Sequence, residues 1–264
     1  MQQLFTGDCL QIMPTLPSGS VDLIVCDPPY GTTLNTWDKV LPFALMWEQY
    51  RRLLAPGGAV ILFGNQPFTS AAVMSNPKWF KQCLVWDKNK CGSPGLAKVR
   101  PMQTHEDIMV FAPGRTIYNP QMEAGEPYAR KTDNPDGYVG RCNNHQYGLK
   151  PRNGFENHGT RYPKSVRRVS RDFSAQQQVH PTQKPVPLLE WLVKTYSNEG
   201  DTVLDNCYGS CSVGIACANT NRKFIGIEKD PDMAKLGANR LAMHLHASCG
   251  MAGSNKSDGR ITHS

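Results

Sequence analysis

The chain has 264 residues, a formal net charge of +7 and a pI of about 8.9, so it can form one large α/β core with room for an insertion. The positive charge permits a polyanionic partner without establishing one. No apolar segment is long enough to cross a membrane and no N-terminal signal segment is visible, which predicts a cytoplasmic protein. Nine scattered cysteines without a Cys-x-x-Cys pair predict reduced thiols, with no disulfide framework and no metal site.

The first informative segment is an apolar run that leads into an unusual loop. Residues 2–5 predict a short strand, and residues 21–26 predict a buried strand that is followed by Asp27-Pro28-Pro29-Tyr30. Proline has a fixed φ and no N–H, so Pro28 and Pro29 stiffen the loop while their carbonyls can still accept hydrogen bonds. With the Asp27 carboxylate, these acceptors suit a planar amino group, and Tyr30 offers a ring for stacking. The alternative is a rigid turn without a ligand.

The next part of the chain alternates between helical and strand patterns. Apolar residues from Phe43 to Leu54 follow helical spacing, and the segment ends at Pro56-Gly57-Gly58. Residues 59–63 predict a strand, residues 68–76 a helix, and residues 84–86 and 108–111 two strands that pair as a hairpin. A loop at 88–95, rich in glycine and basic residues, joins these two strands. It lies either near a ligand or in solvent.

A basic segment separates the two halves of the chain. Residues 114–179 contain eleven Lys or Arg residues and six acidic residues, so five of the seven net positive charges lie there. Basic side chains bind phosphates, and Asn, Gln and Arg side chains read base edges. The segment therefore favours recognition of a nucleic acid, and a long solvated loop is the alternative.

The second half combines a strand, a glycine-containing turn, a helix, another strand and an acid. A strand over 202–205 ends at Asp205, the turn includes Gly209 and Ser210, and the strand over 224–227 precedes Glu228. A glycine lets the backbone approach a ligand, and an acid at the end of the next strand can bind ribose hydroxyls. Because no pyrophosphate-binding pattern is present, this arrangement suits a nucleoside cofactor without phosphates. Helices are predicted at 186–196, 211–220 and 231–246.

Together these segments resemble the amino-directed DNA methyltransferases that use S-adenosylmethionine. The order, with Asp-Pro-Pro-Tyr before the cofactor loop, is that of the β group of these enzymes. Further similar segments are Gly7-Asp8-Cys9-Leu10, Thr104 to Phe111, and His180-Pro181-Thr182-Gln183-Lys184-Pro185, which is the most specific of them. The resemblance covers residues 1–113 and 177–245.

This resemblance implies a doubly wound, mostly parallel seven-stranded sheet of the Rossmann-like methyltransferase type, with one antiparallel strand near an edge. It divides the chain into a catalytic half at 1–113, a target-recognition insertion at 114–179, a cofactor-binding half at 180–248 and a disordered tail at 249–264. Strands that alternate with helices favour the same α/β class.

The resemblance also assigns residues to roles. It implies that Asp27, Pro28, Pro29 and Tyr30 are catalytic, with the target base turned out of the DNA stack. It places S-adenosylmethionine at Asp8, Asp27, Thr182, Lys184, Asp205, Gly209, Ser210 and Glu228. Taken singly, these residues have simpler interpretations: Asp8 caps a turn, Lys184 is solvated, Asp205 initiates a helix, and Glu228 is a surface charge.

The cofactor loop departs from the family pattern Asp-Pro-Phe-x-Gly-Ser-Gly-Thr-Thr. Asn206 and Cys207 replace the Pro and Phe, and Cys211 replaces the second Gly. We expect a looser loop entry and the absence of an apolar wall, and we expect Cys211 to matter if its φ is positive. A DNA-binding protein with a decayed cofactor site is therefore an alternative to an active enzyme.

In the family that the chain resembles, an Asp at the first position of this motif goes mostly with adenine N6 and a Ser mostly with cytosine N4, so the resemblance implies transfer to adenine N6, with cytosine N4 as the alternative. We expect double-stranded DNA as substrate, with contacts from basic residues in the loop and the insertion, namely Lys88, Lys90, Arg161, Arg167 and Arg168. A restriction endonuclease partner is possible on this basis, and the protein is expected to be a monomer or homodimer.

Overall fold

The computed structural model describes residues 1–31, 39–91, 94–130, 155–170 and 183–253. The chain forms two compact units, one from Met1–Asn119 with Ser165–Ser264 and a smaller one from Pro120–Lys164. The predicted site residues fall in both units. The predicted catalytic segment, Asp27 to Tyr30, lies in the larger one.

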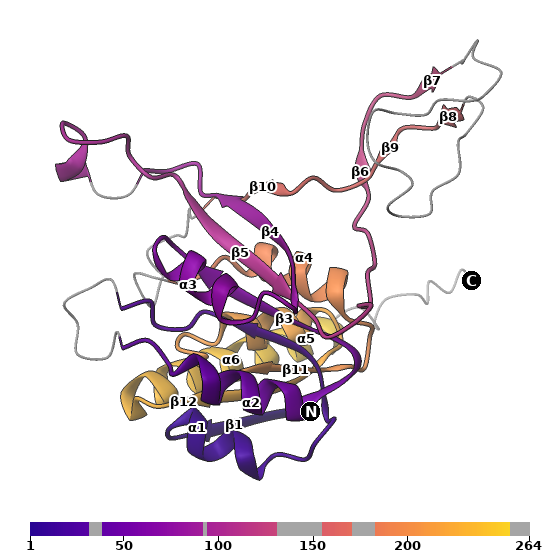
Figure 1. The fold of residues 1–264 in the computed structure, drawn as a ribbon. Helices are drawn as coiled ribbons and strands as arrows, with labels where there is room; N and C mark the ends of the chain where they lie inside the picture. Colours follow the sequence, from indigo (N-terminus) through magenta and orange to yellow (C-terminus); the bar gives the residue numbers. More distant parts are fainter. Residues whose placement is uncertain (32–38, 92–93, 131–154, 171–182, 254–264) are drawn as a thin grey trace, which may run out of the picture. The chain divides into compact units, whose positions relative to one another are not determined.

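The larger unit is built on an eight-stranded sheet, counted over the described residues (Figure 1). Its strands lie in the order β1 (Gln2–Thr6), β12 (Lys223–Glu228), β11 (Thr202–Asp205), β2 (Val21–Cys26), β3 (Leu54–Gly64), β5 (His105–Phe111), β4 (Phe80–Asp87) and β10 (Val166–Arg168). Only β5 is antiparallel to its neighbours among these strands. The doubly wound, mostly parallel sheet is therefore confirmed, and so is the hairpin of β4 with β5.

The expected number of strands was wrong by one. The extra strand is β10, which pairs in parallel with β4 through Val166 opposite Val85 and Arg168 opposite Asp87. Three residues with hardly any apolar alternation give no strand signal of their own, so β10 owes its extended form to the exposed edge of β4.

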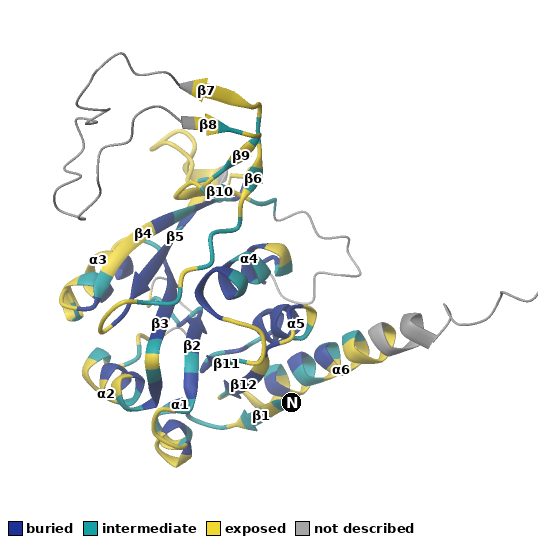
Figure 2. Cartoon of the chain, turned by 90° about the vertical axis from the view of Figure 1, so that its right-hand side faces the viewer, coloured by how far each residue is buried: buried dark blue, intermediate teal, exposed yellow. Residues whose placement is uncertain are grey.

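Helices cover both faces of the sheet, because the side chains of its central strands alternate between the two faces. Leu23 and Val25 of β2 join the core under α4 (Val186–Tyr196), α5 (Ser212–Asn219) and α6 (Pro231–Gly253). Ile24 and Cys26 join the core under α1 (Cys9–Ile12), η1 (Met13–Thr15), α2 (Phe43–Leu53) and α3 (Phe68–Ser75). Figure 2 shows the buried strands between these two layers.

Each predicted helix is present, α1 and η1 were not predicted, and one predicted helix has a different end. Met46, Trp47, Tyr50 and Leu53 are the buried residues of α2, and their spacing was the basis for the prediction. The helix with the different end is α6, which continues to Gly253 rather than ending at 246. Residues 247–249, Ala-Ser-Cys, contain neither proline nor glycine to end it. The predicted disordered tail at 249–264 therefore begins within this helix, and residues 254–264 lie outside the described part.

The smaller unit contains two short antiparallel pairs among its described residues. Strand β6 (Glu123–Ala124) pairs with β9 (Thr160–Arg161), and β7 (Tyr128–Arg130) pairs with β8 (Phe155–Asn157). Asn157 shapes the turn between β8 and β9 because its Oδ1 accepts hydrogen bonds from the backbone N–H groups of Gly159 and Thr160.

Candidate active site

Three carboxylates stand at the carboxyl ends of neighbouring strands. Asp27 follows β2, Asp205 ends β11 and Glu228 ends β12. Leu204 lies opposite Ile24 and Asp205 opposite Gly226, so the three strands end at one edge of the sheet. Ligands of open α/β sheets bind at this edge, which is where the sequence placed the catalytic and cofactor segments.

Asp27 is held through both of its carboxylate oxygens. Its Oδ2 lies 2.5 Å from Lys184 Nζ, and its Oδ1 accepts a hydrogen bond from the Tyr30 hydroxyl. Lys184 is buried, and its charged amine is 157 residues away from Asp27 in sequence. The structure thus brings together two predicted site residues from distant parts of the sequence.

Tyr30 packs inside the loop. Its ring lies 5.1 Å from the ring of Phe68, and Lys184 Nζ lies 6.0 Å from its centroid. Burial and the nearby negative charges of Asp27 and Glu106 raise the pKa of Tyr30 well above its usual value, so its hydroxyl stays protonated and acts as a donor. The Tyr30 ring, which was expected to stack on a ligand, therefore has its hydroxyl bonded to Asp27 in this structure.

A buried carboxylate that sequence reasoning missed completes this cluster. Glu106, in β5, lies with Oε2 3.2 Å from Lys184 Nζ and with Oε1 3.2 Å from Lys88 Nζ. Burial disfavours its ionised form, but the charges of Lys184 and Lys88 outweigh burial and lower the pKa of Glu106. The only signal in the sequence was an acid in the segment of Thr104 to Phe111, and Asp107 beside it gave the same signal.

The glycine loop after β11 is bonded to the end of β12. Gly209 N–H donates to Glu228 Oε2 over 2.9 Å, and Asp230 N–H donates to Glu228 Oε1 over 2.9 Å. Gly209 has φ of +45°, and a Cβ placed on it would meet no atom within 4 Å. The loop therefore faces open space, as a ligand-binding turn requires.

The replaced residues of this loop are tied down rather than loosened. Asn206 is buried, and its Oδ1 accepts a hydrogen bond of 2.6 Å from the Tyr50 hydroxyl of α2. Asn206 Nδ2 lies 3.7 Å from Cys9 Sγ, and the Cys207 N–H donates to Asp205 Oδ1 over 3.0 Å. A side-chain anchor to α2 thus stands where the family pattern has the proline, which argues against the expected loose loop entry.

Cys211 occupies the left-handed region that the family pattern fills with glycine. It has φ of 59° and ψ of 32° and precedes the first residue of α5. Its side chain is fully buried, and a Cβ on Gly214 would come within 2.6 Å of its sulfur. The concern about a positive φ is therefore confirmed, and Gly214 provides the space that the thiol needs.

Helix α6 supports the same loop through two residues that the sequence did not indicate. A Cβ on Gly237 would lie 2.3 Å from the Gly209 carbonyl oxygen, so only glycine permits this approach. Arg240 Nη1 donates to the Ser210 carbonyl over 2.6 Å and to Ser212 Oγ over 2.9 Å. Loop and helix therefore form one packed unit.

The remaining predicted cofactor residues have mixed outcomes. Asp8 accepts a hydrogen bond of 3.0 Å from Leu10 N–H as the cap of α1, and its other oxygen lies 2.9 Å from Lys229 Nζ. It follows β1, whose Thr6 lies opposite Glu228, so it stands at the ligand-binding edge. Thr182 lies outside the described residues.

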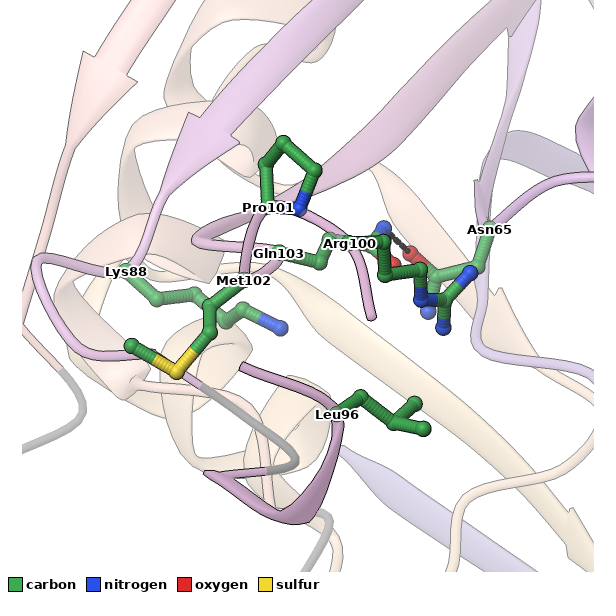
Figure 3. A pocket seen from close by; sticks show the side chains of 7 residues that line it. All are labelled: Asn65, Lys88, Leu96, Arg100, Pro101, Met102 and Gln103. Carbon is green, nitrogen blue, oxygen red and sulfur yellow. Dashed lines mark hydrogen bonds between the residues drawn. The ribbon is translucent and has the colours of Figure 1, made fainter. Parts of the chain in front are cut away.

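A small pocket adjoins the cluster around Glu106. It has a volume of about 160 Å³, and Figure 3 shows Lys88 and Met102 on one side with Asn65 and Arg100 on the other. Gln103 donates to Asn65 Oδ1 over 2.8 Å across its floor. Asn65 follows β3 and Lys88 follows β4, so the pocket opens at the same edge of the sheet as Asp27. Its lining residues are Asn65, Lys88, Leu96, Arg100, Pro101, Met102 and Gln103.

The predicted DNA contacts occupy different environments. Lys88 is buried against Glu106, whereas Lys90 in the following loop is exposed. Arg167 lies over the Trp191 ring at 4.7 Å, and Arg168 Nε lies 2.8 Å from Asp87 Oδ2 with most of its side chain exposed.

Within the smaller unit, Arg161 is part of the local structure. It donates to Asn157 Oδ1 and to the carbonyls of Glu126 and Thr160, and it lies 4.5 Å over the Tyr128 ring. These contacts link both strand pairs of the unit.

The structure has a Rossmann-like, mostly parallel sheet with three carboxylates at the carboxyl ends of neighbouring strands, and comparison with known proteins gives its family. A family model described as DNA methylase, of the N6/N4 type, matches residues 21–239, and the chain belongs to this family. It is 29% identical over 260 residues to DNA adenine methyltransferase YhdJ of Escherichia coli (92% of this chain and 83% of that protein). It is 28% identical over 258 residues to type II methyltransferase M.HpaI of Haemophilus parainfluenzae (91% and 74%).

Solved structures share the fold. The M1.HpyAVI–SAM complex matches with a TM-score of 0.62 at 24% identity, covering 91% of this chain and 99% of that chain. PvuII DNA methyltransferase, which is cytosine-N4-specific, matches with a TM-score of 0.63 at 15% identity, covering 93% and 90%. At these identities the comparison supports the architecture of the sheet.

Membership makes the chain a DNA methyltransferase, and S-adenosylmethionine is the methyl donor of this family. The edge fits that cofactor in charge and in space. Burial and the charges of Asp27 and Glu228 raise the pKa of Asp205, so a cationic ligand that carries a sulfonium and an ammonium group relieves repulsion among three carboxylates. The open space over Gly209 gives such a ligand access to the backbone.

Proposed function

We propose that the chain methylates the N6 amino group of adenine at a specific sequence in double-stranded DNA. The observation that carries the proposal is Asp27, fixed by Lys184 at the end of β2 and next to the open loop of β11. Adenine is supported by the Asp at the first motif position and by the relative named a DNA adenine methyltransferase.

The target base leaves the duplex stack in this proposal, because its amino nitrogen is inaccessible inside the helix. Its amino hydrogens donate to Asp27 Oδ1 and to the carbonyl of Pro28, which Pro29 holds rigid. The amino group thereby takes the place that the Tyr30 hydroxyl now occupies on Asp27, and the freed Tyr30 ring stacks on the base.

The chemistry depends on alignment. S-adenosylmethionine supplies an electrophilic methyl group when it is bound. Hydrogen bonds to Asp27 and Pro28 favour a pyramidal nitrogen whose lone pair points away from these acceptors and toward the methyl carbon. The nitrogen bonds to that carbon as the carbon–sulfur bond breaks, and the nitrogen then releases one proton. We assign Asp8, Asp205, Gly209, Ser210 and Glu228 to the cofactor.

We assign DNA recognition to the basic insertion and to the edge of the sheet formed by β4 and β10. Lys90 and Arg168 are exposed at the carboxyl end of β4 and on β10, where cations attract phosphates. We further propose a cytoplasmic protein, since its DNA substrate lies there, and a restriction endonuclease partner, as the type II relatives suggest. The described helices contain none long and apolar enough to cross a membrane.

The test is a transfer assay that identifies the product. Unmethylated duplex DNA, RNA and a protein mixture are incubated with the enzyme and with S-adenosylmethionine carrying a deuterated methyl group. Each product is digested and weighed by mass spectrometry, and Asp27→Ala serves as the matched inactive control. We expect labelled N6-methyladenine from DNA alone.

Other products contradict the proposal in distinct ways. Labelled N4-methylcytosine would reassign the target base, and label in RNA or protein would reassign the substrate. DNA binding without cofactor binding in calorimetry would identify a decayed cofactor site. Sequencing of single DNA molecules from cells that express the chain then reports the recognition sequence.

A further inference from the structure

A continuous set of ion pairs connects the catalytic acid to the wall of the pocket. It runs from Asp27 to Lys184 (2.5 Å), from Lys184 to Glu106 (3.2 Å) and from Glu106 to Lys88 (3.2 Å). Lys184, Glu106 and Lys88 are all buried. Two carboxylates and two ammonium groups balance each other, so the set carries no net charge inside the protein.

Glu106 is the centre of this set, and its two oxygens are unequal. Oε1 makes a hydrogen bond with Lys88 Nζ. Oε2 is fully buried and lies 3.2 Å from Lys184 Nζ. Because an ammonium group has three donors, Lys184 makes its short hydrogen bond with Asp27 and pairs with Glu106 at the same time, so one cation is shared between two anions.

We propose that Glu106 is a positioning residue for methyl transfer. Because Glu106 shares the positive charge of Lys184, Lys184 orients Asp27 without neutralising it, and Asp27 stays a strong acceptor for the target amino group. This inference rests on the proposed function. It also assigns Lys88 to the support of Glu106 rather than to a DNA phosphate.

The physical reason is that Lys184 makes both of its ion pairs, with Asp27 and with Glu106, inside the protein. An ion pair between buried groups is far stronger than one in water, so an unshared Lys184 would neutralise Asp27 and weaken its bond to an incoming N–H. An absent Lys184 would leave Asp27 free to rotate, and loss of alignment slows transfer steeply. Glu106 sets the balance between these two conditions. Lys88, which lines the pocket (Figure 3), holds Glu106 through its ion pair of 3.2 Å.

Several groups face the Lys184 amine. Asp27, Glu106 and Asp205 are the acidic ones, while the rings of Tyr30 and Phe63 lie 6.0 Å and 5.1 Å from its nitrogen. Burial opposes the charge on Lys184, but Asp27 and Glu106 outweigh it, so the pKa of Lys184 is raised. Loss of the Glu106 charge must lower this pKa, and loss of the Lys88 charge must raise it.

The test is Glu106→Gln in the full chain, with Asp107→Asn as the matched control. Asp107 is the next residue of β5 and bonds to Thr69 Oγ1 over 2.7 Å, outside the ion-pair set. We expect Glu106→Gln to lower kcat by about tenfold to a hundredfold, because an unshared Lys184 weakens the charge-assisted hydrogen bond that Asp27 accepts from the target amino group, with KM for DNA and cofactor affinity almost unchanged. The alkaline limb of its kcat profile should move to lower pH, and Asp107→Asn should match the parent protein.

A second measurement does not depend on activity. Competitive labelling with trace acetic anhydride across a range of pH, read by peptide mass spectrometry, gives the pKa of Lys184 directly. It should fall in Glu106→Gln and rise in Lys88→Gln, and Glu106→Asp should restore most of the parent value. If Glu106→Gln does not fold, Lys88→Gln still tests the sign.

The possible failures are distinguishable. Absence of methyl transfer by the parent protein would reject the proposed function, whereas the labelling experiment would still report on Lys184. An unchanged Lys184 pKa in both variants, or an equal loss of kcat in Asp107→Asn, would overturn the role of Glu106.

Discussion

The close approach of α6 to the cofactor loop makes Gly237→Ala an informative substitution. At an ordinary helical position this change stabilises the protein by about 1 kcal/mol, because alanine is the better helix former. Here the new Cβ would lie 2.3 Å from the Gly209 carbonyl oxygen, 3.0 Å from Tyr208 Cε2 and 3.2 Å from Cys211 Cβ. The first contact is with backbone, which cannot turn aside as a flexible side chain can.

Relief requires the loop and helix to separate by about 1 Å. Overpacking of this kind costs about 3 kcal/mol at the upper end of its usual range, and the helical gain of about 1 kcal/mol offsets part of it. We expect a net loss of about 2 kcal/mol, which corresponds to a Tm lower by about 4–8 °C for a chain of this size. Cofactor affinity should fall with it, because the displaced carbonyl belongs to Gly209.

Urea unfolding and calorimetric titration with S-adenosylmethionine measure the two effects. Asn239→Ala is the matched control, since Asn239 is exposed on the same helix and should gain about 0.5 kcal/mol from helix propensity. If Gly237→Ala were instead stabilised by about 1 kcal/mol with full cofactor affinity, α6 would not press against the loop and the packing argument would be refuted.

Four further outcomes are expected. Asp27→Ala should abolish methyl transfer while calorimetry still detects cofactor binding, and near-normal turnover would show that the acid lies elsewhere. Tyr30→Ala should lower kcat more than it lowers cofactor affinity, and the reverse order would assign its ring to the cofactor. Alanine at both Arg167 and Arg168 should weaken DNA binding and reduce the slope of log K against log salt by about 0.9 for each phosphate that is no longer neutralised, whereas an unchanged slope would remove them from the DNA interface. Burial disfavours the Glu106 anion, yet the two neighbouring lysines lower its pKa below the ordinary 4.5. The Glu106 anion therefore contributes stability at neutral pH, and this contribution disappears as the pH falls below about 4.5. Urea titrations should show that the free energy of unfolding falls less steeply at acidic pH for Glu106→Gln than for the parent protein.

Much of the sheet was predictable because its central strands are short apolar runs with sharp ends. Strand β2 and the helix at Phe43–Leu53 follow from spacing alone, and an acid with two prolines after a buried strand pointed to the catalytic edge. The three-residue strand β10 was not predictable, since its pairing with β4 supplies the order that its own sequence lacks.

The site was predictable where one segment carries its own chemistry, and unpredictable where distant segments meet. Lys88 was predicted to contact DNA because it begins a loop of glycines and lysines, yet the pairing of β4 with β5 places it beside Glu106. Gly237 and Arg240 sit in an ordinary amphipathic helix, and their importance depends on a contact with a loop some thirty residues away.

The insertion at Pro120–Lys164 begins and ends at well-anchored points of the larger unit. Before it, Asn119 N–H donates to the Thr195 carbonyl over 2.8 Å, and its side-chain amide donates to the Ser197 carbonyl over 3.0 Å. After it, the Ser165 carbonyl accepts from Val85 N–H over 2.8 Å, just before β10 joins the sheet. If the insertion reads the target sequence as proposed, these two fixed ends are the points at which a related segment could be exchanged to change the recognition sequence without altering the strands that carry Asp27 and Asp205.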